Sequence, residues 1–159
     1  MAHEKSTAEE RLIELHIELP VLRNPVANYV PFVRLGTLVF LSGQGPLLAN
    51  GSFITGKVGK DLSIEDGYQA ARIVCLQMLA AMRRAAGTLD NIVRIVKVLG
   101  MVNATTDFAE HPRVLNGCSD LLVEIFGDRG RHARSAVGMG SLPGNMAVEI
   151  EAVVEVTAD

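Results

Sequence analysis

The residues best able to do chemistry lie in one basic stretch near the C-terminus. Residues 129–134 read RGRHAR, and Arg134 stands where an apolar run begins. A guanidinium group can grip a carboxylate or a phosphate through two parallel hydrogen bonds. The stretch therefore indicates either an anion-binding site or an ordinary solvated loop that leads into a strand.

Arg134 differs from its basic neighbours because it begins a predicted strand, over about 134–140, and its side chain must take one face. A second strand, over about 147–156, follows the turn SLPGN. Paired as a hairpin, the two strands could bring Glu149 or Glu151 close to Arg134. A simple ion pair would then explain the arginine as well as an anion site does, and the residues alone leave both interpretations open.

Other catalytic patterns are weak. Ser42 in LSGQG resembles the nucleophile elbow G-x-S-x-G, but Phe40 stands where the first glycine is required. Gly43 and Gly45 predict turns and not a phosphate loop, because no G-K-[ST] follows them. The histidines are scattered, without a Cys or His at ligand spacing, so we expect no metal site.

Composition bounds the class of protein. With 159 residues, 48% of them hydrophobic, the chain can form one domain with a real core. A net charge of −3 and the absence of tryptophan argue against a nucleic-acid surface. The polar N-terminus and the lack of a long apolar run predict no signal peptide and no membrane span, hence a cytoplasmic protein. Cys75 and Cys118 lie in apolar helical patterns and are expected to be buried, reduced thiols.

The first part of the chain predicts one helix and one hairpin. A threonine followed by acids begins a short amphipathic helix over 7–17, which Pro20 ends. Two β-rich runs within 29–46 flank Gly36-Thr37 and predict a hairpin. Residues 52–58, SFITGKV, are a candidate for one further short strand.

The second part alternates helices and strands. Ser63, with Asp66 three residues later, resembles a capping box at the start of a long apolar-faced helix that Gly87 ends. A strand over 91–104 is apolar on both sides, which is typical of a central strand. A second helix follows and ends at Gly127.

Strands interrupted by two helices predict an α+β sandwich, in which one mixed sheet carries both helices on one face. The other face also needs cover. The last strand is apolar on one side and carries Glu149, Glu151 and Glu155 on the other. A chain of this length has no third layer, so self-association is the expected cover.

Four stretches together resemble the RidA/YjgF family, often labelled endoribonuclease L-PSP. They are NYV leading into RLGTLVFLSGQGP, IVRIVKVLGMVNATTDFA after the long helix, VLN in the second helix, and ARSAVGMGSLPGNMAVEIEAVVEV. The last is long, gap-free and specific. The match runs from about residue 28 to 156 and divides the chain into an N-terminal helical extension, 1–27, and a RidA/YjgF-like domain, 28–159.

The resemblance implies a chorismate mutase-like fold, a homotrimer and sites in the clefts between subunits. It also implies hydrolysis of reactive 2-imino or enamine acids to 2-keto acids and ammonia, with no metal or organic cofactor. The partners expected are therefore small 2-imino or 2-keto acids and other copies of the chain, with no membrane and no nucleic acid. A non-catalytic ligand-binding or regulatory trimer and an endoribonuclease are the alternatives.

The same resemblance assigns residues. Arg134 is the carboxylate clamp, and Glu149 is the acid that orients or deprotonates water. The substrate-binding residues that it implies are Tyr29, Ser42, Gly43, Asn116 and Ala136. Two positions depart from the family, because Ala136 replaces a frequent cysteine and Ser119 or a neighbour replaces a tyrosine, and these departures leave the substrate's size open.

Overall fold

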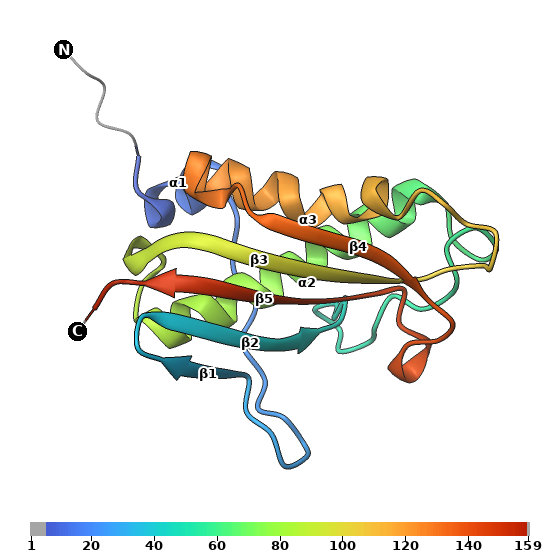
Figure 1. Cartoon of the computed structure of the whole chain (residues 1–159), viewed down its shortest axis with the longest axis horizontal. Coiled ribbons are helices and arrows are strands. Elements are labelled where there is room, and N and C mark those ends of the chain that lie inside the picture. The colour runs from blue at the N-terminus through green and yellow to red at the C-terminus, as the bar shows by residue number, and fades with distance from the viewer. Residues whose placement is uncertain (1–5, 159) are drawn as a thin grey trace.

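One five-stranded sheet organises the structure, a computed structural model that describes residues 6–158. The strand order is β1-β2-β5-β3-β4 (Figure 1). β3 and β4 run parallel, and the other neighbours are antiparallel, so the predicted mixed sheet is confirmed. The strands are β1 (Phe32–Leu35), β2 (Leu38–Gln44), β3 (Ile92–Asn103), β4 (Ala133–Met139) and β5 (Val148–Val156).

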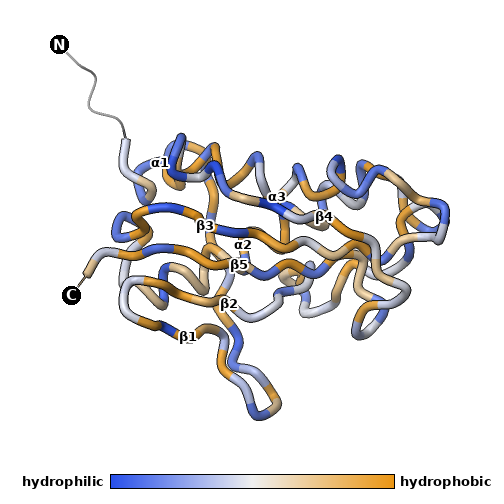
Figure 2. The backbone as a smooth tube through the Cα atoms, viewed as in Figure 1, coloured by the Kyte–Doolittle hydropathy of each residue, from blue (hydrophilic) through white to orange (hydrophobic). Residues whose placement is uncertain are grey.

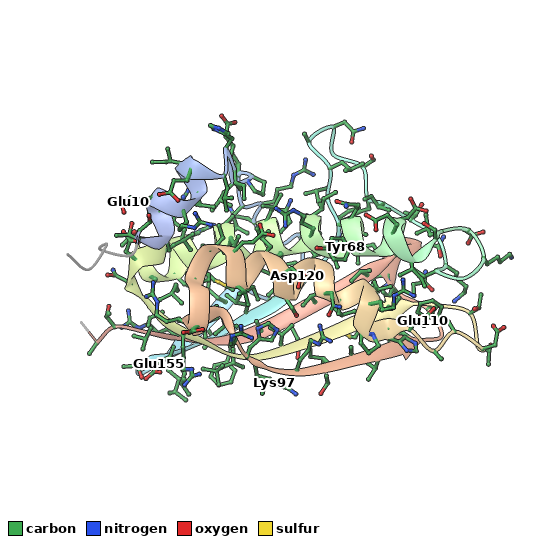
Figure 3. All side chains as sticks on the ribbon, turned by 90° about the horizontal axis from the view of Figure 1, so that it is seen from above. Glu10, Tyr68, Lys97, Glu110, Asp120 and Glu155 are labelled. Atoms are coloured by element: carbon green, nitrogen blue, oxygen red, sulfur yellow. The ribbon has the colours of Figure 1, made fainter. Side chains whose placement is uncertain are left out.

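Two long helices cover one face of this sheet, as predicted (Figure 3). They are α2 (Ile64–Ala86), which packs on β5 and β2, and α3 (His111–Phe126), which packs on β4 and β3. The predicted capping box of Ser63 and Asp66 begins α2, and Gly87 ends it. Short 3-10 turns occupy Leu89–Asn91, Gly127–Gly130 and Pro143–Asn145.

Two glycines set the position of α3. A Cβ atom on Gly117 would collide with the backbone carbonyl of Tyr68, so α2 and α3 cross at backbone contact. A Cβ atom on Gly100 of β3 would collide with Leu115, a fully buried residue of α3. Because glycine allows such close approach, α3 lies close on the sheet and its neighbouring polar residues are held near β4.

A third helix, α1 (Ala8–Glu14), is shorter than the predicted span of 7–17 because the backbone turns left-handed at His16. Leu12 is buried against the rest of the molecule, and Arg11 donates to the Glu124 carbonyl of α3. The helix is therefore docked on the α2–α3 layer. Residues 1–5 of the predicted N-terminal extension lie outside the described residues.

The face of the sheet away from the helices carries apolar side chains in the open. Val33 is 56% exposed, Leu35 70% and Phe40 44%. Along β5 buried residues alternate with partly or fully exposed ones, which Figure 2 shows as alternating hydropathy. Lys97 and Glu155 project from this face in Figure 3. This surface is called the open face below.

Two strand predictions were wrong. The last two strands are not a hairpin, because β3 lies between β4 and β5 and pairs with both. The crossover through α3 returns β4 parallel to β3, a connection that the short SLPGN turn does not reveal. Residues 52–58 form no strand; Phe53, Thr55 and Val58 make only isolated bridges.

Cys75 of α2 and Cys118 of α3 are fully buried free thiols, as predicted. Burial, followed by the neighbouring Cys118 sulfur, raises the pKa of Cys75. A thiol in such surroundings behaves as a small apolar core residue.

Candidate functional site

Arg134 projects from β4 toward α3. Its partner across the strand pair is Val98, which is fully buried on the helix-covered side of the sheet. The Arg134 Nη1 atom donates to Asn116 Oδ1 at 2.9 Å and to Ser119 Oγ at 3.0 Å. Both acceptors belong to α3, three residues apart and so on one side of the helix. α3 therefore holds the guanidinium of Arg134 through its Nη1 atom.

The charge of Arg134 has no acidic partner among residues 6–158, where no carboxylate lies within ion-pair distance of it. The two Nη1 hydrogens are used by neutral oxygens, while in this range Nε and Nη2 make no hydrogen bond. These two atoms form one edge of the guanidinium, the edge that can hold a carboxylate in bidentate fashion. The arrangement fits an anion clamp.

Ser119 and His132 extend this arrangement. Ser119 Oγ lies 3.0 Å from His132 Nε2, and His132 Nδ1 lies 2.6 Å from the Gly130 carbonyl oxygen. Burial, followed by the charge of Arg134, lowers the pKa of His132, while the Gly130 hydrogen bond opposes them. The imidazole is therefore held mainly neutral at pH 7, with its Nδ1 hydrogen on the carbonyl.

Glu149 does not lie beside Arg134, and the ion pair considered from the sequence is wrong. Val148 and Ile150 on either side of Glu149 are fully buried against the helices, so Glu149 points to the open face. Arg134 points to the helix-covered face, two strands away. The structure separates the two residues that the motif implies as partners.

The Glu149 carboxyl occupies space that Gly43 leaves free. A Cβ atom on Gly43 would collide with Glu149 Oε1, so only glycine fits there without a shift. Gly43 belongs to a bulge, because the pairing of β2 with β5 shifts register between Leu41 and Gln44. Bulges of this kind re-aim side chains and are common beside active sites.

The environment of Glu149 favours its neutral form. Burial, followed by the nearby charge of Glu151, raises the pKa of Glu149. No hydrogen bond or ion pair to Glu149 occurs within the described range, so the carboxyl remains available to a ligand or water. A carboxyl with a raised pKa is suited to general acid–base work near neutral pH.

A hydrogen bond ties Ser42 of β2 to the segment before β1 that contains Tyr29. The Ser42 hydroxyl donates to the Val30 carbonyl at 2.6 Å, which ties the segment around Tyr29 to the end of β2. Ser42 precedes Gly43, and Tyr29 is 57% exposed. Ser42 thus has only its oxygen lone pairs left for a ligand.

The candidate site residues form two groups. The anion half-site comprises the predicted residues Asn116, Arg134 and Ala136 together with Ser119 and His132; Ala136 faces the same side as Arg134, across from Gly100. The acid half-site comprises Gly43 and Glu149, with Ser42 before Gly43 and Tyr29 in the segment that Ser42 holds. Arg134 and Glu149 point to opposite faces of the sheet.

Arg129 and Arg131, the other arginines of the basic stretch, have local roles. Arg129 donates to the Ile92 carbonyl at 2.7 Å, and Arg131 pairs with Asp128 at 3.4 Å on the surface. Neither contacts the anion half-site through a hydrogen bond. The structure therefore supports the interpretation of both as loop residues.

His132 and Ser119 are the residues of the site that sequence reasoning passed over. Part of the signal was present, because Ser119 is three positions after Asn116 on a helix, which places both on one side of it. His132 lies directly before β4 and outside the strand, so no strand spacing relates it to Arg134. Without the contact between α3 and β4, neither residue is singled out as a partner of the arginine.

The structure bears on the expected absence of a metal site and of a membrane span. Between residues 6 and 158, no three His, Cys, Asp or Glu side chains cluster as a metal ion would require. Over the same span, no helix has the length and apolar character needed to cross a bilayer. The absence of a cofactor and the cytoplasmic location remain predictions.

Comparisons with known proteins agree with the fold. The family described as "YjgF/chorismate_mutase-like, putative endoribonuclease" matches residues 9–155. A Trypanosoma cruzi protein named TCP17 is 43% identical over 145 residues, 91% of each chain. The solved structure of Agrobacterium tumefaciens Atu1372, of unknown function, is 42% identical, with a TM-score of 0.87 over 94% of this chain and 92% of that one. A Dermatophagoides farinae protein named 2-iminobutanoate/2-iminopropanoate deaminase is 28% identical over 139 residues, 87% of this chain and 93% of that protein.

The family match begins at residue 9, inside the segment predicted as an extension, and the division at residue 28 remains a prediction. The matched region includes both half-sites and all of the strands except the last residue of β5. Since the match covers nearly the whole chain and agrees with the resemblance of the C-terminal motif, this protein belongs to the YjgF/chorismate mutase-like family, also called RidA/YjgF.

Proposed function

We propose that the chain is an imine and enamine deaminase, which hydrolyses small reactive 2-imino acids to 2-keto acids and ammonia. The observation that carries this is Arg134, a braced guanidinium with no acidic partner in residues 6–158 and one free edge. Every 2-imino acid presents a carboxylate to such an edge. The relative named as a 2-iminobutanoate/2-iminopropanoate deaminase supports the choice of substrate.

The active form in this proposal is a homotrimer. Arg134 and Glu149 lie on opposite faces of one sheet, so one small substrate cannot contact both within a single chain. If a second copy packs its anion half-site against the open face of the first, the two half-sites meet at the subunit boundary. The exposed apolar side chains of Val33, Leu35 and Phe40 supply a surface for that contact.

The chemistry then follows from the two half-sites. Arg134 holds the substrate carboxylate, which places the electrophilic C=N carbon at the boundary. The substrate reacts as the protonated imine. Glu149 takes a proton from water as the water oxygen bonds to the C=N carbon, and the π electron pair moves to nitrogen, which becomes a neutral amine. The same carboxyl returns that proton to the amine of the tetrahedral adduct. The C–N bond then breaks as the hydroxyl oxygen forms C=O, and the hydroxyl proton passes to the Glu149 carboxylate and from there to the departing ammonia. Ammonia leaves, and no electron donor or acceptor is consumed.

A coupled assay tests this function. An amino-acid oxidase generates 2-imino acids, and semicarbazide traps whatever imine persists. We expect the protein to lower semicarbazone formation, and Arg134→Ala to reduce that effect by about 100-fold, because two charge-assisted hydrogen bonds are lost. The matched control is Arg131→Ala, since Arg131 is exposed and pairs only with Asp128.

Two outcomes would contradict the proposal. One is a protein that does not accelerate imine loss, and the other is an Arg134→Ala variant as active as the unmodified chain. If calorimetry shows that 2-oxobutanoate binds while turnover is absent, the chain is instead a ligand-binding trimer. Ala136, which lacks the thiol frequent at this position, is the residue that motivates this second candidate.

A further inference from the structure

The hydrogen bond from Arg134 to Ser119 continues to a further residue, His132. Ser119 Oγ receives an Nη1 hydrogen of Arg134 and also lies in hydrogen-bond contact with His132 Nε2. On its far side, His132 Nδ1 contacts the Gly130 carbonyl, which can only accept a hydrogen. The carbonyl thus assigns the hydrogen to Nδ1 and leaves Nε2 as an acceptor in the neutral ring.

This assignment fixes the donor and the acceptor of each hydrogen bond that connects Gly130, His132, Ser119 and Arg134. Ser119 must donate its hydroxyl hydrogen to His132 Nε2 and turn a lone pair to Arg134. Asn116 Oδ1 takes the other Nη1 hydrogen. Arg134 is consequently held in one rotamer, with its Nε and Nη2 edge turned away from α3.

We propose that Ser119 and His132 are positioning residues for the anion clamp, and that binding of a 2-keto or 2-imino acid carboxylate at Arg134 is coupled to protonation of His132. This inference rests on the proposed function, because it assumes that Arg134 binds the substrate carboxylate. It adds the regulation of that site by pH. It also assigns a use to Ser119, which stands at or next to the position where the resemblance implies a tyrosine.

The sign of the coupling follows from charge. Arg134 is the charged group that acts on His132 from its own strand, while α3 contributes only the neutral Ser119 hydroxyl. In the preceding turn, Asp128 and Arg131 pair with each other. A bound carboxylate offsets the charge of Arg134, so it raises the pKa of His132. By linkage, protonated His132 binds the anion more tightly, and affinity increases as the pH falls.

When His132 is protonated, Nε2 becomes a donor and Ser119 accepts from both neighbours. Ser119 still accepts from Arg134 Nη1, so the guanidinium stays braced in both protonation states. The clamp therefore gains one nearby positive charge on this titration. Glu149 of a neighbouring copy titrates as well, and a variant that removes only the imidazole separates the two groups.

The test measures 2-oxobutanoate binding by calorimetry at pH 7.5 and pH 5.5, and follows His132 by NMR with and without the ligand. We expect Ser119→Ala to bind about tenfold more weakly, because a hydrogen bond to a charged group is lost. We expect binding by the unmodified chain to be about threefold tighter at pH 5.5, the size of one screened charge contact. The pKa of His132 should increase when the ligand binds.

Two variants of His132 separate positioning from plain packing. His132→Gln keeps an acceptor near Nε2, so we expect normal affinity at pH 7.5 and a smaller gain at pH 5.5. His132→Ala removes the acceptor, and we expect weaker binding at both pH values. The matched controls are Ser52→Ala and His16→Gln, both at exposed positions distant in sequence from the site. Circular dichroism of each variant confirms that it is folded.

The outcomes distinguish this inference from the proposed function. If the unmodified chain binds 2-oxobutanoate and Arg134→Ala abolishes binding, the clamp stands. The roles of Ser119 and His132 (the relay) are then overturned if Ser119→Ala binds as the unmodified chain does, His132→Gln keeps the full gain in affinity at pH 5.5, and the His132 resonances of the unmodified chain do not shift on binding. If the unmodified chain does not bind 2-oxobutanoate at either pH, both the clamp and the relay are overturned.

Discussion

Neutral acceptors hold the Arg134 guanidinium in place and leave its positive charge available to a ligand. A carboxylate partner would satisfy the guanidinium and compete with any ligand. Asn116 and Ser119 instead take two hydrogens without cancelling the charge. A half-buried cation braced in this way still favours an anion at its free edge, because its desolvation is not compensated within residues 6–158.

The surroundings of Glu149 disfavour its charge, since it is a half-buried carboxyl near another acid, Glu151. Its pKa is raised by burial and by Glu151, so the protonated form is favoured in the folded chain. That favourable contribution is complete below the unfolded value of about 4.5 and is lost as the pH rises through the folded value. At pH 7.5 the ionised carboxyl therefore lowers the free energy of unfolding.

Glu149→Gln should accordingly stabilise the protein at pH 7.5 while it removes deaminase activity. We expect a higher melting temperature than that of the unmodified chain at pH 7.5, and little difference at pH 4, where both side chains are neutral. Scanning calorimetry at the two pH values gives the comparison. Glu155→Gln, on the same face of β5, is the control. Equal melting temperatures at pH 7.5 would show that Glu149 causes no such destabilisation.

At the scale of elements, the unit β3–α3–β4 builds the anion half-site. The helix crosses between two parallel strands, so Asn116, Ser119 and Arg134 come from adjacent parts of the same unit. The existence of each element followed from hydrophobic periodicity and caps in the sequence. The strand order did not, because local spacing cannot distinguish a hairpin from a crossover that leaves β3 between β4 and β5.

The tight contact between α2 and α3 gives a test of this unit. Gly117→Ala adds a Cβ atom against the Tyr68 carbonyl, which is backbone and cannot rotate away. We expect the free energy of unfolding to fall by about 2–3 kcal/mol, the usual cost of overpacking. Urea denaturation measures it.

Gly140→Ala is the matched control for this substitution, since a Cβ atom there meets no heavy atom within 4 Å. It should change stability by less than about 0.5 kcal/mol. If Gly117→Ala proves equally mild, the helices are not in backbone contact at this point, and another contact must hold α3 near β4.

The site was predictable only through resemblance. Arg134 and Glu149 stood out by motif, while the residues themselves left an ion pair and an anion site equally open. The two face opposite sides because of the strand register. Arg134 pairs with Val98, which pairs with Ala152, so these three side chains share a face, and Glu149 lies three residues before Ala152 and points to the other face. This register is set by pairing between distant segments, and local sequence does not contain it.

At the scale of the whole molecule, the open face is the surface on which the proposed assembly rests. Val33, Leu35 and Phe40 expose apolar surface next to the acid half-site strand β2. Burying such side chains between subunits yields about 25 cal/mol for each Å² removed from water. The same contact would join two incomplete half-sites, so assembly and activity would depend on one surface.

Mixing two inactive variants tests this dependence. Arg134→Ala chains keep the acid half-site, and Glu149→Gln chains keep the anion half-site. The two are mixed in equal amounts, unfolded together and refolded. At each boundary, the chance that one subunit supplies an intact anion half-site is one in two, and the chance that its neighbour supplies an intact acid half-site is also one in two. We expect about a quarter of the boundaries to be complete, and about a quarter of the normal activity to return, as a cyclic assembly requires.

Refolding either variant alone is the control and should restore no activity. A double variant, Arg134→Ala with Glu149→Gln, mixed with the unmodified chain sets the baseline for dilution. Size-exclusion chromatography with light scattering reports the assembly. Activity that does not return from a mixture that assembles normally would place both residues in one subunit's site, or in none.

The strand order also has a consequence for synthesis. β5 is the last of the strands to leave the ribosome, yet it lies at the centre of the sheet between β2 and β3. Until residue 156 has emerged, the β1–β2 hairpin has nothing to pair with and β3 presents an unpaired edge. The sheet of this protein is therefore completed only after translation of its last strand, and nascent chains should depend on protection of those edges during elongation.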